Sequence, residues 1–189
     1  DMGSKVEKDT EQVMQRGRVL PRVDWNTWGI PCIDAFDMSK AEKALKFTFD
    51  PVTQEWTQAL IMVHVKEPFA SGAMRTACHM TDLSVPHEER LNVLKLSKLS
   101  NEDPRTYFDD VRMQADAKRY AEEYNMHNPP KKVDFLAAHV LKLLDRPDQP
   151  FGGVEKHIKG EYRKYNSNWD WSDEKRNTPQ AFSHFTWEA

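Results

Sequence analysis

Two positively charged side chains stand in contexts where they could contact the phosphates of a nucleotide. The first is Arg75, three residues after Gly72 in the segment PFASGAMR, which separates two stretches of alternating apolar and polar residues. A glycine in such a turn lets the backbone approach a phosphate, and an arginine can pair with two phosphate oxygens at once. On spacing alone, an ordinary hairpin with a surface arginine is the more common origin of this pattern.

The second candidate is a lysine at the end of a short apolar segment. Lys95 follows Asn92, Val93 and Leu94, a context similar to that of a strand lysine directed into a cleft. Kinases use such a lysine as a point charge on the nucleotide phosphates. An isolated lysine is far more often solvated, and Lys98 could take the same role.

Metal ligands are harder to identify. His184 lies in the aromatic segment AFSHFTWE, where a lone histidine is usually a packed core residue. The two cysteines, Cys32 and Cys78, form neither a CxxC pair nor a disulfide framework. The residues by themselves therefore do not define a metal centre.

Composition indicates one globular domain. Of the 189 residues, 39% are hydrophobic and 30% are charged, as in soluble domains. The 27 lysines and arginines against 30 aspartates and glutamates give a formal charge of -3, which argues against nucleic-acid binding. No apolar run approaches the roughly 18 residues that a membrane helix needs. Few cysteines and no secretory signal favour a cytoplasmic, reducing compartment.

Hydrophobic patterning predicts a sheet that would position these groups. Residues 46–49 and 56–65 are typical of two strands around a polar turn. Apolar side chains alternate with polar ones along the second strand, as a half-buried strand requires. Residues 73–81 can form a return strand, so 68–72 would be the loop of a hairpin.

Two helices are also predicted. The stronger signal runs from about Thr106 to His127, with Thr106 as its N-cap, and ends before a Pro-Pro pair. A second helix over 179–187 has Thr178 as its cap and a proline at its first position. A short helix is expected near Ser39–Leu45.

The remaining segments are less regular. Residues 133–144 are expected to form a buried strand or mixed segment, and 152–165 a strand pair or an extended link. The order of the elements predicts an α+β domain with an antiparallel sheet.

Several motifs taken together resemble the alpha-type (atypical) protein kinases. They occur in the family's order over about residues 46–189, and they are EPFASGAMR, YFDDVRMQADAKRYAEEYN, NPPKKVDF, GVEKHIKGEYRKYNSN and TPQAFSHFTWE. They look closest to the branch of the elongation factor 2 and myosin heavy chain kinases. The resemblance implies a two-lobed kinase that transfers the γ-phosphoryl group of ATP to serine or threonine of a protein substrate.

The resemblance also implies a division of the chain. Residues 1–22 would be a flexible leader, and 23–189 a partial kinase domain. Within that domain, about 46–153 would form the N-terminal lobe, with a twisted antiparallel sheet and one long flanking helix. About 154–160 would be the interlobe link, and about 161–189 the start of the C-terminal lobe with its first helix.

Carried over motif by motif, the resemblance implies how the phosphates of ATP are held. The segment from Gly72 to Arg75 would form the loop over them. Lys95 would be the lysine that contacts them. Asp110, on the long helix, would be the ion-pair partner of Lys95.

The same resemblance implies roles near the adenine and at a zinc site. Glu155 would lie in the interlobe link, and the backbone of His157 and Ile158 would hydrogen-bond the adenine. His184 would be the first of four ligands of a structural zinc. The other three ligands do not match any position of this sequence.

The cofactors implied are ATP, magnesium and, in the complete domain, zinc. The family's metal-binding and catalytic aspartates, its substrate loop and its other zinc ligands would lie beyond Ala189. We therefore expect this chain alone to bind nucleotide weakly and to show negligible turnover. The alternatives are a pseudokinase-like nucleotide-binding or scaffolding module and a non-catalytic interaction domain.

Overall fold

The computed structural model describes residues 38–167, 171–173, 175 and 178–189. The expected leader over 1–22, and Cys32, lie outside these residues. The elements in chain order are η2 (Met38–Lys40), β1 (Glu42–Asp50), β2 (Glu55–Ser71), β3 (Arg75–Asp82), η3 (His87–Glu89), β4 (Leu91–Ser97), α2 (Arg105–Met126), β5 (Ala138–Leu143), β6 (Phe151–Lys156) and α3 (Thr178–Glu188). The α+β class is confirmed, because the described residues combine an antiparallel sheet with separate helices.

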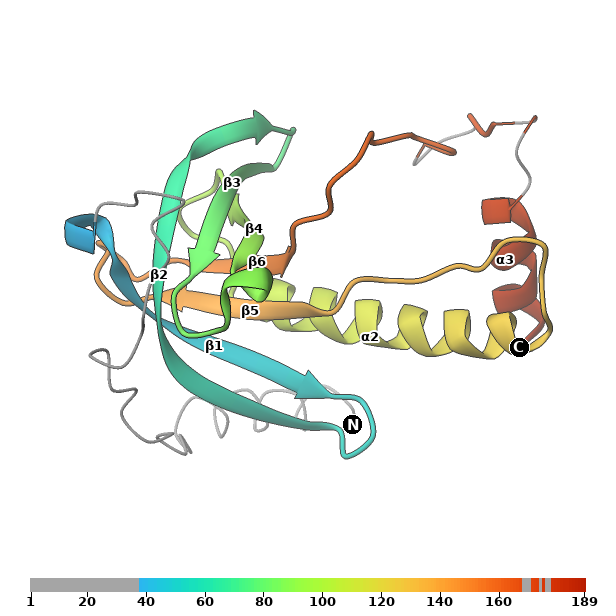
Figure 1. Ribbon diagram of the computed structural model, residues 1–189, viewed down its shortest axis with the longest axis horizontal. Helices are drawn as coiled ribbons and strands as arrows, with labels where there is room; N and C mark the ends of the chain where they lie inside the picture. Colours follow the sequence, from blue (N-terminus) through green and yellow to red (C-terminus); the bar gives the residue numbers. More distant parts are fainter. Residues whose placement is uncertain (1–37, 168–170, 174, 176–177) are drawn as a thin grey trace.

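The strands form a closed antiparallel barrel in the order β1-β2-β3-β4-β6-β5 (Figure 1). Consecutive strands from β1 to β4 are neighbours, whereas β6 inserts between β4 and β5 and closes the sheet. Side chains alternate between the inside and the outside of the barrel. One set fills the interior: Ala44, Ile61, Val63, Met80, Leu94, Leu141, Leu143 and Val154.

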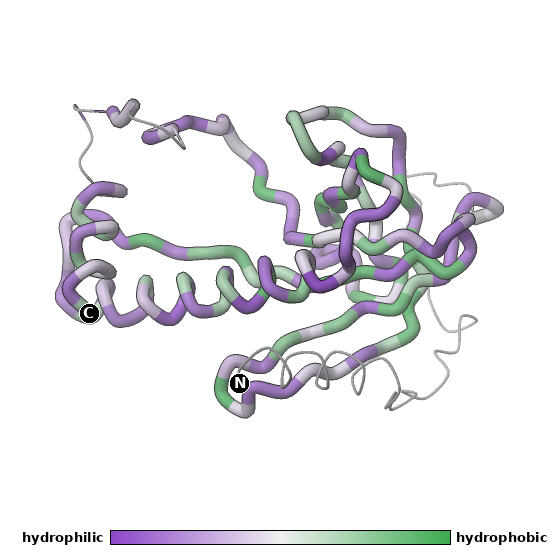
Figure 2. The backbone as a smooth tube through the Cα atoms, turned by 180° about the vertical axis from the view of Figure 1, so that it is seen from behind, coloured by the Kyte–Doolittle hydropathy of each residue, from purple (hydrophilic) through white to green (hydrophobic). Residues whose placement is uncertain are grey.

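The long helix α2 packs against the outside of the barrel. Its residues Tyr107, Phe108 and Val111 are buried there against Phe47 and other outward-facing residues of β1 and β5. The rings of Phe47 and Phe108 meet edge to face with their centroids 5.3 Å apart. Figure 2 shows hydrophobic and hydrophilic patches alternating along α2, as expected of a helix that buries one side.

The helix α3 lies against the end of α2 that is far from the barrel (Figure 1). The ring of Tyr124 on α2 meets the rings of Phe182 and Phe185 on α3, each with centroids 5.5 Å apart. Residues 157–167 leave β6 as an extended segment without helix or ladder, apart from one bridge between Asn166 and Ser172. The predicted helix over 179–187 is confirmed, and of the segment 152–165 the residues up to Lys156 belong to strand β6.

Three local expectations are wrong. The short helix near Ser39–Leu45 is only the turn η2, because β1 already begins at Glu42 and pairs with β2. The hairpin loop is shorter than 68–72, because β2 continues to Ser71 through irregularities in its pairing at Pro68.

The third correction concerns the start of α2. The helix begins at Arg105 and Pro104 occupies the cap position, so Thr106 is not the N-cap. The carboxylate of Asp103 instead accepts a hydrogen bond from the backbone N–H of Arg105 at 3.0 Å. Within the described part of the chain, no helix has the length and apolar character needed to cross a membrane.

Candidate nucleotide site

A pocket of about 340 Å³ lies between α2 and the outer face of β4 and β6. Arg75 and Lys95, the two cations that the resemblance places at the phosphates of ATP, both line it. The other lining residues are Tyr107, Asp110, Val111, Met113, Gln114, Ala117, Phe135, Ala138, Gly153, Val154 and Glu155.

Lys95 is positioned by the pairing of β4 with β6. It lies opposite Gly153, which leaves its side chain free to run across β6 toward Glu155, two residues further along. The Lys95 Nζ atom is 2.7 Å from Glu155 Oε1, and the two side chains are 40% and 21% exposed. The expected Lys95–Asp110 ion pair is therefore wrong: the carboxylate that contacts Lys95 is Glu155. Glu155 itself lies within β6.

Arg75 is the first residue of β3, and it is Arg75 rather than Lys95 that forms the ion pair with Asp110. Its Nη1 atom donates to Asp110 Oδ2 at 2.8 Å, and Glu102 lies 3.8 Å from the other terminal nitrogen. The guanidinium carbon lies 4.7 Å from the centroid of the Tyr107 ring. Partial burial opposes the charged form, but the hydrogen bond and charge of Asp110 raise the pKa of Arg75 above its ordinary value.

Tyr107 was not singled out from the sequence, yet it joins the parts of the site. Its hydroxyl accepts a hydrogen bond from the backbone N–H of Ser97, at the end of β4, at 3.0 Å. Burial, and then a hydrogen bond with Glu102, raise the pKa of Tyr107 to about 12. The buried tyrosine therefore stays neutral and fixes the end of β4 beneath Arg75. A tyrosine in a helix gives no sequence signal for this role.

Lys98 holds the turn between β2 and β3. Its Nζ atom donates to the Gly72 carbonyl at 2.5 Å, and its backbone N–H donates to the Met74 carbonyl at 2.9 Å. The Gly72 N–H in turn donates to the Arg75 carbonyl at 2.9 Å. Lys98 does not line the pocket, so of the two candidate lysines it is Lys95 that shares the pocket with Arg75.

The first residue after β6, His157, contacts β3 and β4. The backbone N–H of His157 donates to the Leu91 carbonyl at 3.0 Å, so this group already has a partner within the barrel. The His157 ring meets that of His79 at 5.2 Å, and His79 stacks on Phe69 at 4.0 Å. Neither His157 nor Ile158 lines the pocket, and their adenine contacts stay a prediction.

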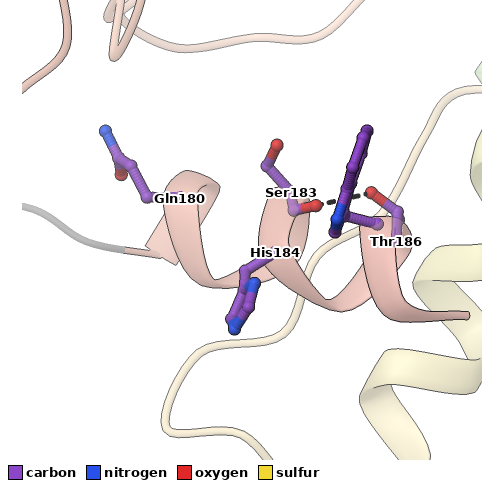
Figure 3. Close-up of a pocket in the computed structure, with 5 residues that line it drawn as sticks. Gln180, Ser183, His184 and Thr186 are labelled. Atoms are coloured by element: carbon purple, nitrogen blue, oxygen red, sulfur yellow. Dashed lines mark hydrogen bonds between the residues drawn. The ribbon is translucent and has the colours of Figure 1, made fainter.

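Among the residues that the structure describes, those around His184 do not assemble a metal site. Figure 3 shows a shallow depression whose lining residues all belong to α3, with His184 and Ser183 directed to opposite sides of the helix. The His184 side chain is 71% exposed, and its Nε2 atom is 3.5 Å from Glu188. Structural zinc needs four ligands, and the described residues contain no group of three His, Cys, Asp or Glu side chains that could hold a metal.

Cys78 is buried in the barrel, and this burial raises the pKa of its thiol.

Comparison with known proteins identifies the family. The sequence profile of the alpha-kinase family matches residues 70–189. Alpha-protein kinase 1 of Dictyostelium discoideum is 45% identical over 153 residues, which are 80% of this chain and 11% of that protein. Human eukaryotic elongation factor 2 kinase is 39% identical over 155 residues, which are 78% of this chain and 21% of that protein.

Solved structures agree with these sequence matches. The alpha-kinase domain of myosin heavy chain kinase A, in complex with ADP, superposes with a TM-score of 0.71 and 31% identity. That match includes 82% of this chain and 75% of the other. The chain spans about a fifth or less of the length of the curated relatives named above. Its sequence, its barrel and helices, and its similarity to a solved kinase domain place this chain in the alpha-kinase family of protein kinases.

Proposed function

We propose that this chain supplies the nucleotide-binding part of an ATP-dependent protein kinase that phosphorylates serine or threonine. The single observation that carries the proposal is the pocket shared by Arg75 and Lys95. Support also comes from the similar kinase domain, which was solved with ADP. An intracellular location is part of the proposal, because the reaction consumes ATP.

Each of the two cations forms an ion pair with a carboxylate of the same pocket. Asp110 pairs with Arg75, and Glu155 pairs with Lys95, so each cation has a carboxylate partner at the pocket before any ligand enters. Both ion pairs are partly exposed, so their net energies are small and solvent-screened. A triphosphate carries more negative charge than one carboxylate, and charge-assisted hydrogen bonds from both cations can form to it. The arrangement therefore favours a ligand with several phosphate oxygens.

The same pocket also has an apolar side. Val111 and Ala117 of α2 face it, together with Phe135 and Ala138 from the segment before and at the start of β5. Pockets for small ligands are usually apolar with few polar groups that fix orientation. We assign the phosphates to the side of Arg75 and Lys95, and the predicted adenine contacts remain those with the backbone of His157 and Ile158.

Phosphoryl transfer also involves magnesium, which bridges the phosphates and neutralises developing charge. Because the described residues form no acidic cluster, we assign magnesium no protein ligand. What Lys95 and Arg75 contribute is positioning and neutralisation of the phosphate oxygens. The expectation that this chain alone has negligible turnover stays a prediction.

Binding of a fluorescent ATP analogue tests the assignment of the pocket. Lys95→Met should weaken binding by about tenfold or more, because a charge-assisted contact to phosphate is lost. Lys43→Met, an exposed lysine on the outside of β1, is the matched control and should bind as the parent chain does. Equal affinity of all three proteins would overturn the assignment.

Transfer of label from γ-labelled Mg-ATP, followed by phosphoamino-acid analysis, tests the reaction. The full-length protein should label serine or threonine of a protein substrate. Labelled tyrosine would contradict the proposed acceptor. Label transferred by this chain alone would contradict the expected inactivity. Tight ATP binding without transfer in the full-length protein would favour the pseudokinase alternative.

A further inference from the structure

One end of the barrel interior is polar. The apolar layers formed by residues such as Leu94 and Leu141 are followed, toward this end, by inward-facing Lys46, Asn92 and His139. With Asp82 and Lys156 they line a cavity of about 240 Å³ at this end of the barrel, which we call the mouth. Polar groups that face a barrel interior cost free energy unless they find partners, and mouths of barrels are common ligand sites.

The cavity's acidic group is already neutralised by the protein. Asp82 is 1% exposed and accepts a hydrogen bond from the backbone N–H of Ser84 at 2.9 Å. Lys46 Nζ is 3.6 Å from Asp82 Oδ2. The second carboxylate of the lining, Glu89, is exposed on the rim. The fixed negative charge therefore lies at the wall and the edge of the cavity.

Two nitrogen groups remain for a ligand. Thr48 Oγ1 lies 3.1 Å from His139 Nδ1, so Nε2 is the ring nitrogen left without this partner. The Lys156 ammonium group makes no ion pair with any described residue and is exposed at the mouth. Burial, and then the charge of Lys46, lower the pKa of His139 to about 4. The positive group that acts on the imidazole is Lys46, and an anion bound beside it would offset this charge.

We propose that the mouth of the barrel binds a phosphate-type anion between Lys46, His139 and Lys156. Lysine ammonium groups bind phosphate as point charges, and Lys46 can bridge the anion and Asp82. The proposal does not depend on the proposed kinase activity.

The mouth and the nucleotide pocket are different sites, even though neighbouring residues of β5 line both. Phe135 and Ala138 line the nucleotide pocket, whereas Leu136 and His139 line the mouth. Within β5 successive side chains point to opposite faces, so Ala138 packs on the outside of the barrel and His139 faces its interior. Variants can therefore be chosen that affect one site and leave the other unchanged.

Titration with inorganic phosphate, followed by the NMR signal of the His139 imidazole, tests the site. We expect a saturable shift of that signal and a rise in the pKa of His139, because a bound anion offsets the charge of Lys46. Lys156→Gln should weaken binding by about tenfold, as expected for loss of one charge-assisted contact. Lys43→Gln removes an outward-facing lysine of the barrel and should change affinity less than about twofold.

A second control separates this site from the nucleotide pocket. In Lys95→Met the phosphate-dependent shift of His139 should persist with affinity unchanged to within about twofold. Loss of the shift in Lys95→Met, or its persistence at full affinity in Lys156→Gln, would overturn the proposal. No saturable shift in the parent chain would also overturn it. Lys46 is left intact because its removal would leave buried Asp82 without its cation.

The same titration with a phosphoserine peptide distinguishes the two sources of this chemistry. Tighter binding of the peptide than of free phosphate, dependent on Lys156, would assign the site to a phosphorylated side chain. Equal or weaker binding of the peptide would assign it to the free ion. Both results support an anion site.

Discussion

Substitution of Gly152 tests whether the barrel closes as described. Gly152 lies on β6 opposite Leu96 of β4 and Leu141 of β5. A Cβ atom there would lie 2.8 Å from Leu94 Cδ1, 2.9 Å from Leu96 Cδ2 and 3.0 Å from the Lys95 carbonyl oxygen. Leu94 is fully buried, and the carbonyl belongs to the backbone of β4. Neither group can move aside without disturbing the core.

The expected cost of Gly152→Ala follows from these contacts. Overpacking a core costs about 1–3 kcal/mol, and replacing a glycine returns about 0.4–1 kcal/mol by restricting the unfolded chain. We therefore expect the free energy of unfolding to fall by about 1–2 kcal/mol, and the thermal midpoint by about 3–6 °C. Urea and thermal denaturation followed by circular dichroism measure both quantities.

The neighbouring glycine is the matched control. A Cβ atom on Gly153 would meet only Tyr107 Cδ1, at an ordinary 3.9 Å. Gly153→Ala should therefore leave the free energy of unfolding unchanged or raise it by less than about 1 kcal/mol. Equal effects of the two substitutions, or a stable Gly152→Ala protein, would refute the described register of β6 between β4 and β5.

Two further predictions concern the two sides of the barrel wall. Phe47→Ala should lower the free energy of unfolding by about 3–5 kcal/mol, because this ring is 1% exposed and packs on Phe108. Urea denaturation measures the change. A loss below about 1 kcal/mol would contradict the packing of α2 on the barrel. His139 has a folded pKa of about 4, below the roughly 6.5 of an unfolded histidine. The unfolded state therefore takes up a proton first as the pH falls, so stability should be complete above about pH 6.5 and decrease toward pH 4, by up to about 3 kcal/mol. His139→Gln should remove this component of the pH dependence, and an unchanged dependence in the variant would contradict the buried neutral imidazole.

The sequence was sufficient to predict elements with a regular local pattern. The long helix, the hairpin that carries Arg75, and the strand position of Lys95 all follow from periodicity and turn residues. The family motifs added the expectation that Arg75 and Lys95 share a pocket. In each case the evidence lies within a few neighbouring residues.

The remaining features depend on pairing between distant segments. Residues 39–45 contain good helix formers, but pairing with β2 makes 42–45 part of a strand, because tertiary contacts override local propensity. Asp110 is bound to Arg75 because of the angular position of α2 on the barrel, which no local pattern specifies.

The polar mouth was also missed. Lys46 lies on β1, far in sequence from His139 on β5 and Lys156 on β6. The alternation of each strand predicts that such residues face one side, but only the closed barrel decides that this side is the interior.

The most direct test of the central claim is the affinity of the chain for Mg-ATP relative to adenosine, measured by calorimetry in the parent protein, Arg75→Met and Lys95→Met. If both cations contact the phosphates in one pocket, each substitution should reduce the preference for ATP by about tenfold and leave adenosine binding within about twofold of the parent value. A loss that is equal for ATP and adenosine, or an unchanged preference in either variant, would contradict the assignment of Arg75 and Lys95 to the phosphates.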